Sequence, residues 1–327
     1  MMMRMTLKLT VAAVFLAFLA GGTSAECQRI AFWNVENYFD TRNDSIADDD
    51  AYTPTGENHW TQNRFKRKRD NIYKVVLGLG QPAIMGLAEV ENDYVMAELV
   101  NGTPLRKKGY RYIHYDSPDH RGIDCALLYR HDLFSPVYSR AVNVSESNYE
   151  TRDLLLVLGV SSQGDSIAVI VCHLPSKRGG ATAERHRSRI AGILRECTDT
   201  LGRNHPGAAI VVMGDFNADR YETPFMQDFA FEPQHSNPEG LYNLMYTLPN
   251  DEGTHNYGGR WSCLDQIFYR PPQEAKNGDL PKVRIFKPEF LLEKDKNNLT
   301  VRPLRTYRGQ LYLGGFSDHL PIYFDLH

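Results

Sequence analysis

The feature that most constrains the fold is a series of short apolar runs, rich in β-branched residues, that recurs along the chain. Runs of this length, bounded by turn-forming residues, are typical of buried strands. They occupy residues 29–33, 83–88, 124–129, 154–160, 167–172, 208–213, 264–269 and 320–326. Two other sets have helical spacing: Ile72, Val75, Val76 and Leu79, and Ile190, Ile193, Leu194 and Cys197. The pattern predicts an α/β protein with a mixed sheet or two packed sheets, flanked by helices.

The first 25 residues form a separate unit. A basic start with Arg4 and Lys8 precedes an apolar stretch over 11–20 and small residues that end at Ala25. This is the pattern of a cleaved signal peptide over 1–25, so we expect a secreted or periplasmic protein. Lipidation of Cys27 is the alternative, although Glu26 departs from the lipoprotein pattern. The apolar part of the leader is too short for a permanent membrane span, and no later stretch is predicted to be transmembrane. No Pro/Gly/Ser-rich linker divides the rest of the sequence, so we predict one catalytic domain over 26–327.

Charge and cysteine content exclude some functions. The net charge of the full chain is −3, and removal of the leader with its two cations leaves −5. A mildly acidic protein is not a general electrostatic binder of nucleic acid, so any polyanion must be gripped locally. The five cysteines are scattered and have no C-x-x-C spacing, which argues against a structural zinc site.

Polar side chains gather where the apolar runs begin or end. One such residue is typical of a turn or a helix cap. Here six runs carry them: Asn34, Glu36 and Asn37; Glu89, Glu91 and Asn92; His173; Asp215 and Asn217; Asp265; and Ser317, Asp318 and His319. So many carboxylates, amides and imidazoles at strand ends predict a site at one edge of the sheet.

The ordered set of these motifs resembles the endonuclease/exonuclease/phosphatase superfamily. The matching segments are Asn34, "EVE" at 89–91, "HL" at 173–174, "GDFN" at 214–217, "LDQI" at 264–267 and "SDHLPI" at 317–322. The resemblance implies a four-layer α/β sandwich, in which two face-to-face mixed β-sheets are flanked by helices. It also implies a divalent-metal phosphoesterase site at one end of the sandwich. By resemblance Asp265 orients His319, and His173 contacts the scissile phosphate or the leaving oxygen, as in the deoxyribonuclease, sphingomyelinase and inositol-phosphatase branches.

The chemistry of phosphoester hydrolysis assigns a metal role to three of these residues. Catalysis needs a hard cation, an activated water and donors for the developing charge. Glu89 is predicted to be the principal Mg²⁺ ligand, with Asn34 beside it, because Mg²⁺ prefers carboxylate and amide oxygen. Asp318 is a candidate for a second metal position or for an orienting role. Oxygen ligands do not separate Mg²⁺ from Mn²⁺ or Ca²⁺.

Three further residues are assigned to the reacting groups. If Asp215 and Asn217 stay extended, both side chains point to one face of the strand. Asp215 then holds and deprotonates the attacking water, while Asn217 donates to a phosphate oxygen. His319, paired with a carboxylate, is favoured as the cation and stabilises phosphate charge.

Substrate contacts are predicted at Tyr129 and Arg130, which close an apolar run, and at Lys177 and Arg178. Loops 48–70, 177–187 and 252–261 carry cations, two of them with aromatic residues. Such loops suit nucleic acid or nucleotides, and inositol phosphates nearly as well.

We therefore predict a secreted Mg²⁺-dependent phosphoesterase, of nuclease type, whose oligomeric state the sequence leaves open. One alternative is a phosphomonoesterase or a phospholipase-C-like hydrolase of inositol-phosphate or sphingomyelin headgroups. A second is an inactive binding protein on the same fold, which the retained Glu89, Asp215, Asp265 and His319 disfavour.

Overall fold

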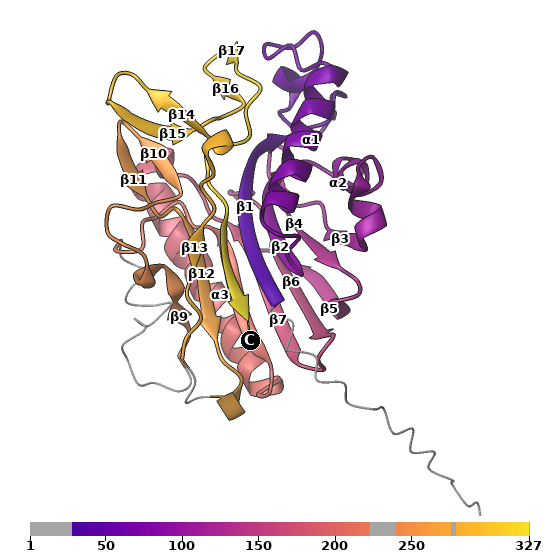
Figure 1. The fold of residues 1–327 in the computed structure, drawn as a ribbon, viewed down its shortest axis with the longest axis vertical. Coiled ribbons are helices and arrows are strands. Elements are labelled where there is room, and N and C mark those ends of the chain that lie inside the picture. Colours follow the sequence, from indigo (N-terminus) through magenta and orange to yellow (C-terminus); the bar gives the residue numbers. More distant parts are fainter. Residues whose placement is uncertain (1–27, 223–239, 276–278, 327) are drawn as a thin grey trace, which may run out of the picture.

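The chain forms two six-stranded sheets in a computed structural model that describes residues 28–222, 240–275 and 279–326 (Figure 1). The predicted signal peptide and Cys27 lie outside the described residues. Sheet A has the order β13 (Arg284–Ile285), β18 (Ile322–Leu326), β1 (Gln28–Tyr38), β2 (Ile84–Val90), β4 (Asp124–Arg130), β3 (Tyr110–His114). Sheet B has the order β5 (Phe134–Val142), β6 (Leu154–Ser161), β7 (Ser166–His173), β8 (Ala209–Asp215), β12 (Asp265–Arg270), β9 (Tyr242–Asn243). Both sheets are mixed, because β1 runs parallel to β2 and β7 parallel to β8 among antiparallel neighbours.

Helices cover the outer faces of both sheets. The apolar faces of α1 (Gln62–Gly78) and α2 (Asp93–Asn101) pack with Trp33 and Leu87 of sheet A. The apolar face of α3 (Gly180–Asn204) packs with Ile170 and Val212 of sheet B. A third core between the sheets joins Phe32 to Val211 and their neighbours. The four-layer sandwich is confirmed.

Each of the eight apolar runs overlaps a strand and extends beyond it by two residues at most, and both helical sets lie in helices except for Leu79, which is the C-cap of α1. The sequence pattern did not predict β3, β5, α2 or the small elements. The hairpins are β10 (His255–Tyr257) with β11 (Arg260–Ser262), β14 (Leu292–Asp295) with β15 (Thr300–Pro303), and β16 (Tyr307–Arg308) with β17 (Leu311–Tyr312). The short 3-10 helices are η1 (Asp50–Tyr52), η2 (Pro104–Lys108), η3 (Lys177–Gly179), η5 (Leu244–Thr247), η6 (Gln273–Ala275) and η7 (Glu289–Leu291). The three hairpins gather at the upper end of the sandwich in Figure 1.

The basic run near the start of α1 holds the chain segment before β18 against the helix. The Lys68 ammonium is buried and donates to Thr306 Oγ1 at 2.6 Å and to the Phe316 carbonyl at 2.7 Å. Arg67 Nε donates to the Gly314 carbonyl at 3.1 Å. These cations therefore serve tertiary structure at the end of the sandwich that carries the hairpins.

The four described cysteines are free thiols. Within the described ranges, every helix is too short or too polar to cross a bilayer.

Candidate active site

The predicted site residues converge at one rim of the sandwich. Glu89, His173 and Asp215 lie at the carboxyl ends of β2, β7 and β8. Asp265 begins β12, which runs antiparallel to β8, and His319 shortly precedes β18, which runs antiparallel to β1. These directions bring all five residues to the same edge. Within sheet B, Asp215 is paired in register with His173 on one side and with Asp265 on the other.

Asn34 of β1 joins the two sheets at this rim. Its Nδ2 donates to Glu89 Oε1 at 3.3 Å and to Asp215 Oδ2 at 3.0 Å. Its Oδ1 accepts from the Glu36 backbone N at 2.9 Å, which fixes the orientation of the amide. The oxygen of Asn34 thus accepts from backbone and its NH₂ group bridges the two carboxylates, while the role of Asn34 as a metal ligand stays a prediction.

His319 is held by a buried carboxylate. Its Nδ1 lies 2.7 Å from Asp265 Oδ2, and its Nε2 lies 3.8 Å from Asp215 Oδ2 and 4.0 Å from Asp318 Oδ1. Burial opposes the charged form, but the carboxylates of Asp265 and Asp215 outweigh it and raise the pKa of His319 well above its ordinary value. The ring is thus an imidazolium at neutral pH, with Nε2 facing the rim.

His173 has the opposite protonation state. Its Nε2 lies 3.5 Å from Asp215 Oδ2 and 3.9 Å from Glu89 Oε1. Burial, and then the charge of Arg152, lower the pKa of His173 well below its ordinary value, so the ring is neutral. Arg152 also donates to the carbonyls of His173 and Leu174, at 3.2 and 2.8 Å, and so fixes the loop that carries the ring.

Asn217 departs from the predicted extended conformation. Strand β8 ends at Asp215, and Asn217 has a φ of 50°. Its backbone N donates to Asp215 Oδ1 at 2.8 Å, and its Nδ2 donates to the Leu174 carbonyl at 2.9 Å. The two side chains are therefore not side by side on one strand face, because the chain turns directly after the strand and Asn217 braces that turn.

The donor set at the rim fits a hard divalent cation. Asp215 is buried, and this burial, with the nearby charge of Asp265, raises its pKa to about 7. The Glu89 side chain is 14% exposed, and its Oε2 accepts from the Asn37 backbone N at 2.9 Å. Two carboxylates therefore face one amide and one neutral imidazole, an oxygen-rich arrangement that suits Mg²⁺ with retained waters.

Asp318 already has a cationic partner. Its Oδ2 accepts from Arg305 Nη2 at 2.8 Å. Burial opposes ionisation, but His319 and Arg305 lower the pKa of Asp318 below its ordinary range. A ligand atom of Asp318 lies within 4.8 Å of ligand atoms of His255 and His319. The ion pair with Arg305 fits the orienting role better than a second metal position.

A distorted stretch of β1 forms part of the rim. The pairing of β1 with β2 shifts register between Asn34 and Tyr38, and Glu36, Asn37 and Glu89 have φ values of 56°, 52° and 64°. Such backbone is strained for residues other than glycine and is found at functional sites. The bulge directs Glu36 to Arg305 and to the Thr306 backbone N. Burial, and then the charge of Asp318, raise the pKa of Glu36 to about 7.

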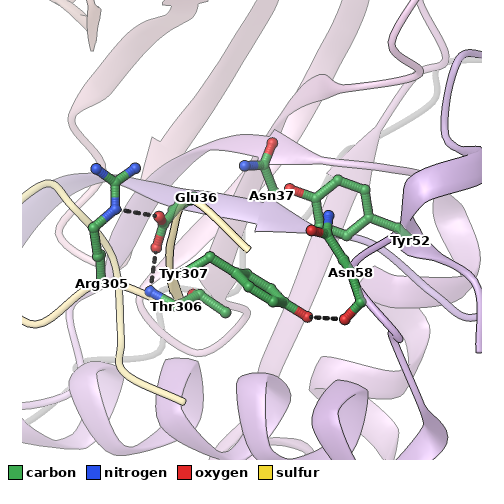
Figure 2. A pocket seen from close by; sticks show the side chains of 8 residues that line it. Glu36, Asn37, Tyr52, Asn58, Arg305, Thr306 and Tyr307 are labelled. Carbon is green, nitrogen blue, oxygen red and sulfur yellow. Dashed lines mark hydrogen bonds and ion pairs between the residues drawn. The ribbon is translucent and has the colours of Figure 1, made fainter. Parts of the chain in front are cut away.

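The bulge also borders a pocket of about 170 Å³ (Figure 2). It is lined by Glu36, Asn37, Tyr52, Asn58, Arg305, Thr306, Tyr307 and Gly309. Tyr52 and Asn58 were predicted only as part of the loop over 48–70, and Arg305 and Tyr307 were not predicted, because no local sequence pattern distinguishes them.

The predicted substrate contacts of Tyr129 and Arg130 are wrong. Strand β4 runs antiparallel to β2, so Asp124 lies opposite Val90 while Tyr129 lies opposite Ile84, at the far end of sheet A. Arg130 pairs there with Asp132.

Lys177 and Arg178 lie in η3, which follows shortly after β7 ends at His173. Lys177 forms an ion pair with Glu222. A role for Lys177 and Arg178 in substrate binding stays a prediction.

The fold and this rim define the class of metal-dependent phosphoester hydrolases. The profile described as the endonuclease/exonuclease/phosphatase family matches residues 29–327, and the chain belongs to that family. A search of curated proteins found no match.

Solved structures share the fold. A Bacteroides thetaiotaomicron family protein is 16% identical with a TM-score of 0.58, covering 91% of this chain and 97% of that one. A mannosyl-6-phosphatase from the same organism is 17% identical with a TM-score of 0.56, covering 92% and 100%. D. rerio TDP2 complexed with a single-strand DNA product is 16% identical with a TM-score of 0.54, covering 92% and 98%. At these identities the likeness concerns the fold alone.

Proposed function

We propose that this protein is an exported hydrolase that uses Mg²⁺ to cleave a phosphoester by in-line attack of water. The observation that carries the proposal is the contact of Asn34 and His173 with the carboxylates of both Glu89 and Asp215, beside the His319–Asp265 pair. A hydrolytic site needs a cation ligand, a proton acceptor and a charged donor within one substrate's reach, and this rim supplies all three.

The roles follow from the protonation states. Glu89 would hold Mg²⁺, which when bound neutralises phosphate charge and polarises the ester. Asp215, fixed by Asn34 and by the Asn217 backbone, accepts the proton of the attacking water. The His319 imidazolium stabilises the developing phosphate charge, and Asp265 keeps it protonated and oriented. Neutral His173 contacts the phosphate or the leaving oxygen.

Two substrate classes fit this chemistry. The sequence favours a nuclease-type phosphodiesterase, and TDP2, which has the same fold, is solved with a DNA product. A phosphomonoesterase is supported by a separate observation, because the pocket beside Glu89 holds only about 170 Å³. The mannosyl-6-phosphatase with the same fold is consistent with this second class.

The test is turnover by the protein without residues 1–25. This shortened protein is incubated, with Mg²⁺ or with a chelator, with each of five substrates: plasmid DNA, bis-p-nitrophenyl phosphate, p-nitrophenyl phosphate, inositol phosphates and sphingomyelin. Asp215→Asn and His319→Ala are compared with Asn101→Ala, a substitution at the end of α2. We expect Mg²⁺-dependent release from at least one substrate, lost in both site variants and kept in the control. Absence of turnover from every substrate, or equal turnover in Asp215→Asn, refutes the proposal.

A further inference from the structure

We propose that the pocket bounded by Asn37, Tyr52, Asn58 and Tyr307 receives the alcohol part of the substrate, and that this alcohol is an uncharged, polyhydroxylated ring. Figure 2 shows the four side chains around this space. A sugar or an inositol has the required chemistry. The inference rests on the proposed hydrolase function and names the substrate class for the same site.

The pocket adjoins the predicted metal ligand. The Asn37 backbone N donates to Glu89 Oε2 at 2.9 Å, while the Asn37 side chain lines the pocket. One residue therefore belongs to both the rim and the pocket. A phosphate held at Glu89 would therefore lie beside the pocket, with Asn37 between them.

The pocket presents hydrogen-bonding groups that the protein itself leaves unused. Among the described residues, the Asn37 amide, the Tyr52 hydroxyl and the Asn58 amide have no hydrogen-bond partner, and Figure 2 draws none for them. Tyr307 differs, because its hydroxyl donates to the Asn58 carbonyl at 2.9 Å. Two amides and a phenol both donate and accept without charge, which matches the hydroxyl groups of a polyol. Polar groups that converge in a pocket fix the orientation of a ligand.

The charge of the pocket argues against a second phosphate. Its one lining cation is Arg305, which donates from Nε to Glu36 at 3.1 Å and from Nη2 to Asp318 at 2.8 Å. Two carboxylates therefore neutralise this guanidinium. Arg64 lies behind this lining, where it donates to the Asn58 carbonyl and to the Tyr307 hydroxyl and lies over the Tyr312 ring. A neutral ring therefore meets no unpaired charge on the lining itself, whereas a second phosphate would find no free cation there.

Aromatic packing fixes the walls of the pocket before any ligand binds. Tyr52 stacks on Phe39 with ring centroids 4.2 Å apart and meets Trp60 edge-on at 5.9 Å. Tyr307 meets Tyr52 edge-on at 6.5 Å. A rigid wall lowers the ordering cost of binding. The volume of about 170 Å³ is below the roughly 300 Å³ at which pockets for drug-sized ligands begin, so one ring fits.

The experiment compares substrates that share a phosphate and differ in the alcohol. The substrates are glucose 6-phosphate, mannose 6-phosphate, ribose 5-phosphate, myo-inositol 1-phosphate, adenosine 5′-monophosphate and p-nitrophenyl phosphate, all with Mg²⁺. The variants are Tyr52→Phe, which keeps the ring packing, and Asn58→Ala. The matched controls are Tyr138→Phe, on edge strand β5, and Asn101→Ala.

We expect the wild type to prefer at least one polyol phosphate over p-nitrophenyl phosphate. Each pocket variant lowers kcat/KM for that polyol phosphate by about two- to tenfold, the effect of one neutral hydrogen bond. Both control variants keep kcat/KM within about twofold for every substrate, so the readout for the pocket variants is a fall in the ratio of kcat/KM for the polyol phosphate to that for p-nitrophenyl phosphate. The free polyol inhibits the wild type competitively and the Asn58→Ala variant less strongly, a readout that remains if Tyr52→Phe fails to fold.

Three outcomes overturn the inference, and the third also bears on the proposed hydrolase function. If phosphate esters are cleaved, but the pocket variants affect all of them equally or none, the pocket does not select the alcohol. If only adenosine 5′-monophosphate depends on the pocket, a base occupies it in place of a polyol. If the wild type cleaves none of these monoesters, the inference has failed, and the proposed function fails with it only if plasmid DNA and bis-p-nitrophenyl phosphate also stay intact.

Discussion

Replacing Asp265 by Asn tests the His319–Asp265 pair most directly. The substitution keeps the size of the side chain and removes its charge, and the Nδ1···Oδ2 contact of 2.7 Å is the only hydrogen bond that the described structure gives to the His319 ring. A hydrogen bond to a charged group contributes about 1.5–3 kcal/mol, and a neutral one about 0.5–1.5 kcal/mol. The difference of about 1–1.5 kcal/mol corresponds to a loss of about tenfold in kcat. His319→Ala removes the charged donor itself, and removal of a donor that stabilises charge in the transition state typically lowers kcat by about 10²–10³.

The double variant distinguishes orientation from an independent role. If Asp265 acts through His319, the Asp265→Asn/His319→Ala enzyme is no slower than His319→Ala alone. The assay is kcat with the best substrate found, with circular dichroism to verify folding. Losses that multiply in the double variant would refute an orienting role for Asp265.

The same variant has a signed pH dependence. His319 acts as a cation, so activity is present below its pKa and is lost as pH rises through it. Burial opposes that cation, and Asp265 is the foremost of the charges that raise the pKa of His319. Asp265→Asn must therefore move the alkaline limb of the kcat–pH profile to lower pH. An unmoved limb shows that another group sets it.

Three other predictions concern stability, metal and the corrected residues. Lys68→Met should lower the free energy of unfolding, measured by urea denaturation, by about 3–5 kcal/mol, because the buried Glu36 carboxylate 4.0 Å away loses its ammonium partner. Adding Glu36→Gln should recover part of this loss. If it recovers none, the two residues are not coupled. Mg²⁺ at about 100 times its Kd should stabilise the wild type by about 2.7 kcal/mol in thermal melts, and Glu89→Gln should lose this stabilisation. If Mg²⁺ raises the stability of the wild type and of Glu89→Gln equally, the ion does not bind at Glu89. Tyr129→Phe and Arg130→Gln should keep kcat/KM within about twofold, and a larger loss would return the substrate to that end of sheet A.

The sequence predicted the layers because their signals are local. A buried strand and an amphipathic helix each place apolar residues at a fixed period, so β7 and α3 were readable before any contact was known. Strand β5 was not readable, because it is an edge strand with exposed positions and Pro136. The nine residues of α2 are too few for a long periodic pattern, although Asn92 caps the helix by accepting from the Val95 backbone N.

Strand direction explains which site residues were placed correctly. The predicted residues at strand ends are brought together when their strands point the right way, as at Glu89 and Asp215. Tyr129 also ends its strand, but β4 points away from the rim. Sequence spacing carries no direction, since a strand end looks the same at either edge of a sheet. Arg305 lies outside any strand end and reaches Glu36 only through tertiary structure.

The bulge in β1 links the two halves of the proposed site in a way that local sequence does not encode. Glu36 and Asn37 both take positive φ, a conformation that favours glycine, yet both positions require a side chain. Regular pairing would alternate the two side chains across the sheet, whereas the bulge lets Glu36 meet Arg305 while Asn37 faces the pocket and its backbone N holds Glu89. Strain at these residues is therefore the cost of joining the predicted metal ligand to the pocket for the alcohol. A substitution that relaxed the bulge would disturb phosphate and alcohol binding together, whereas Asn58→Ala is expected to disturb alcohol binding alone.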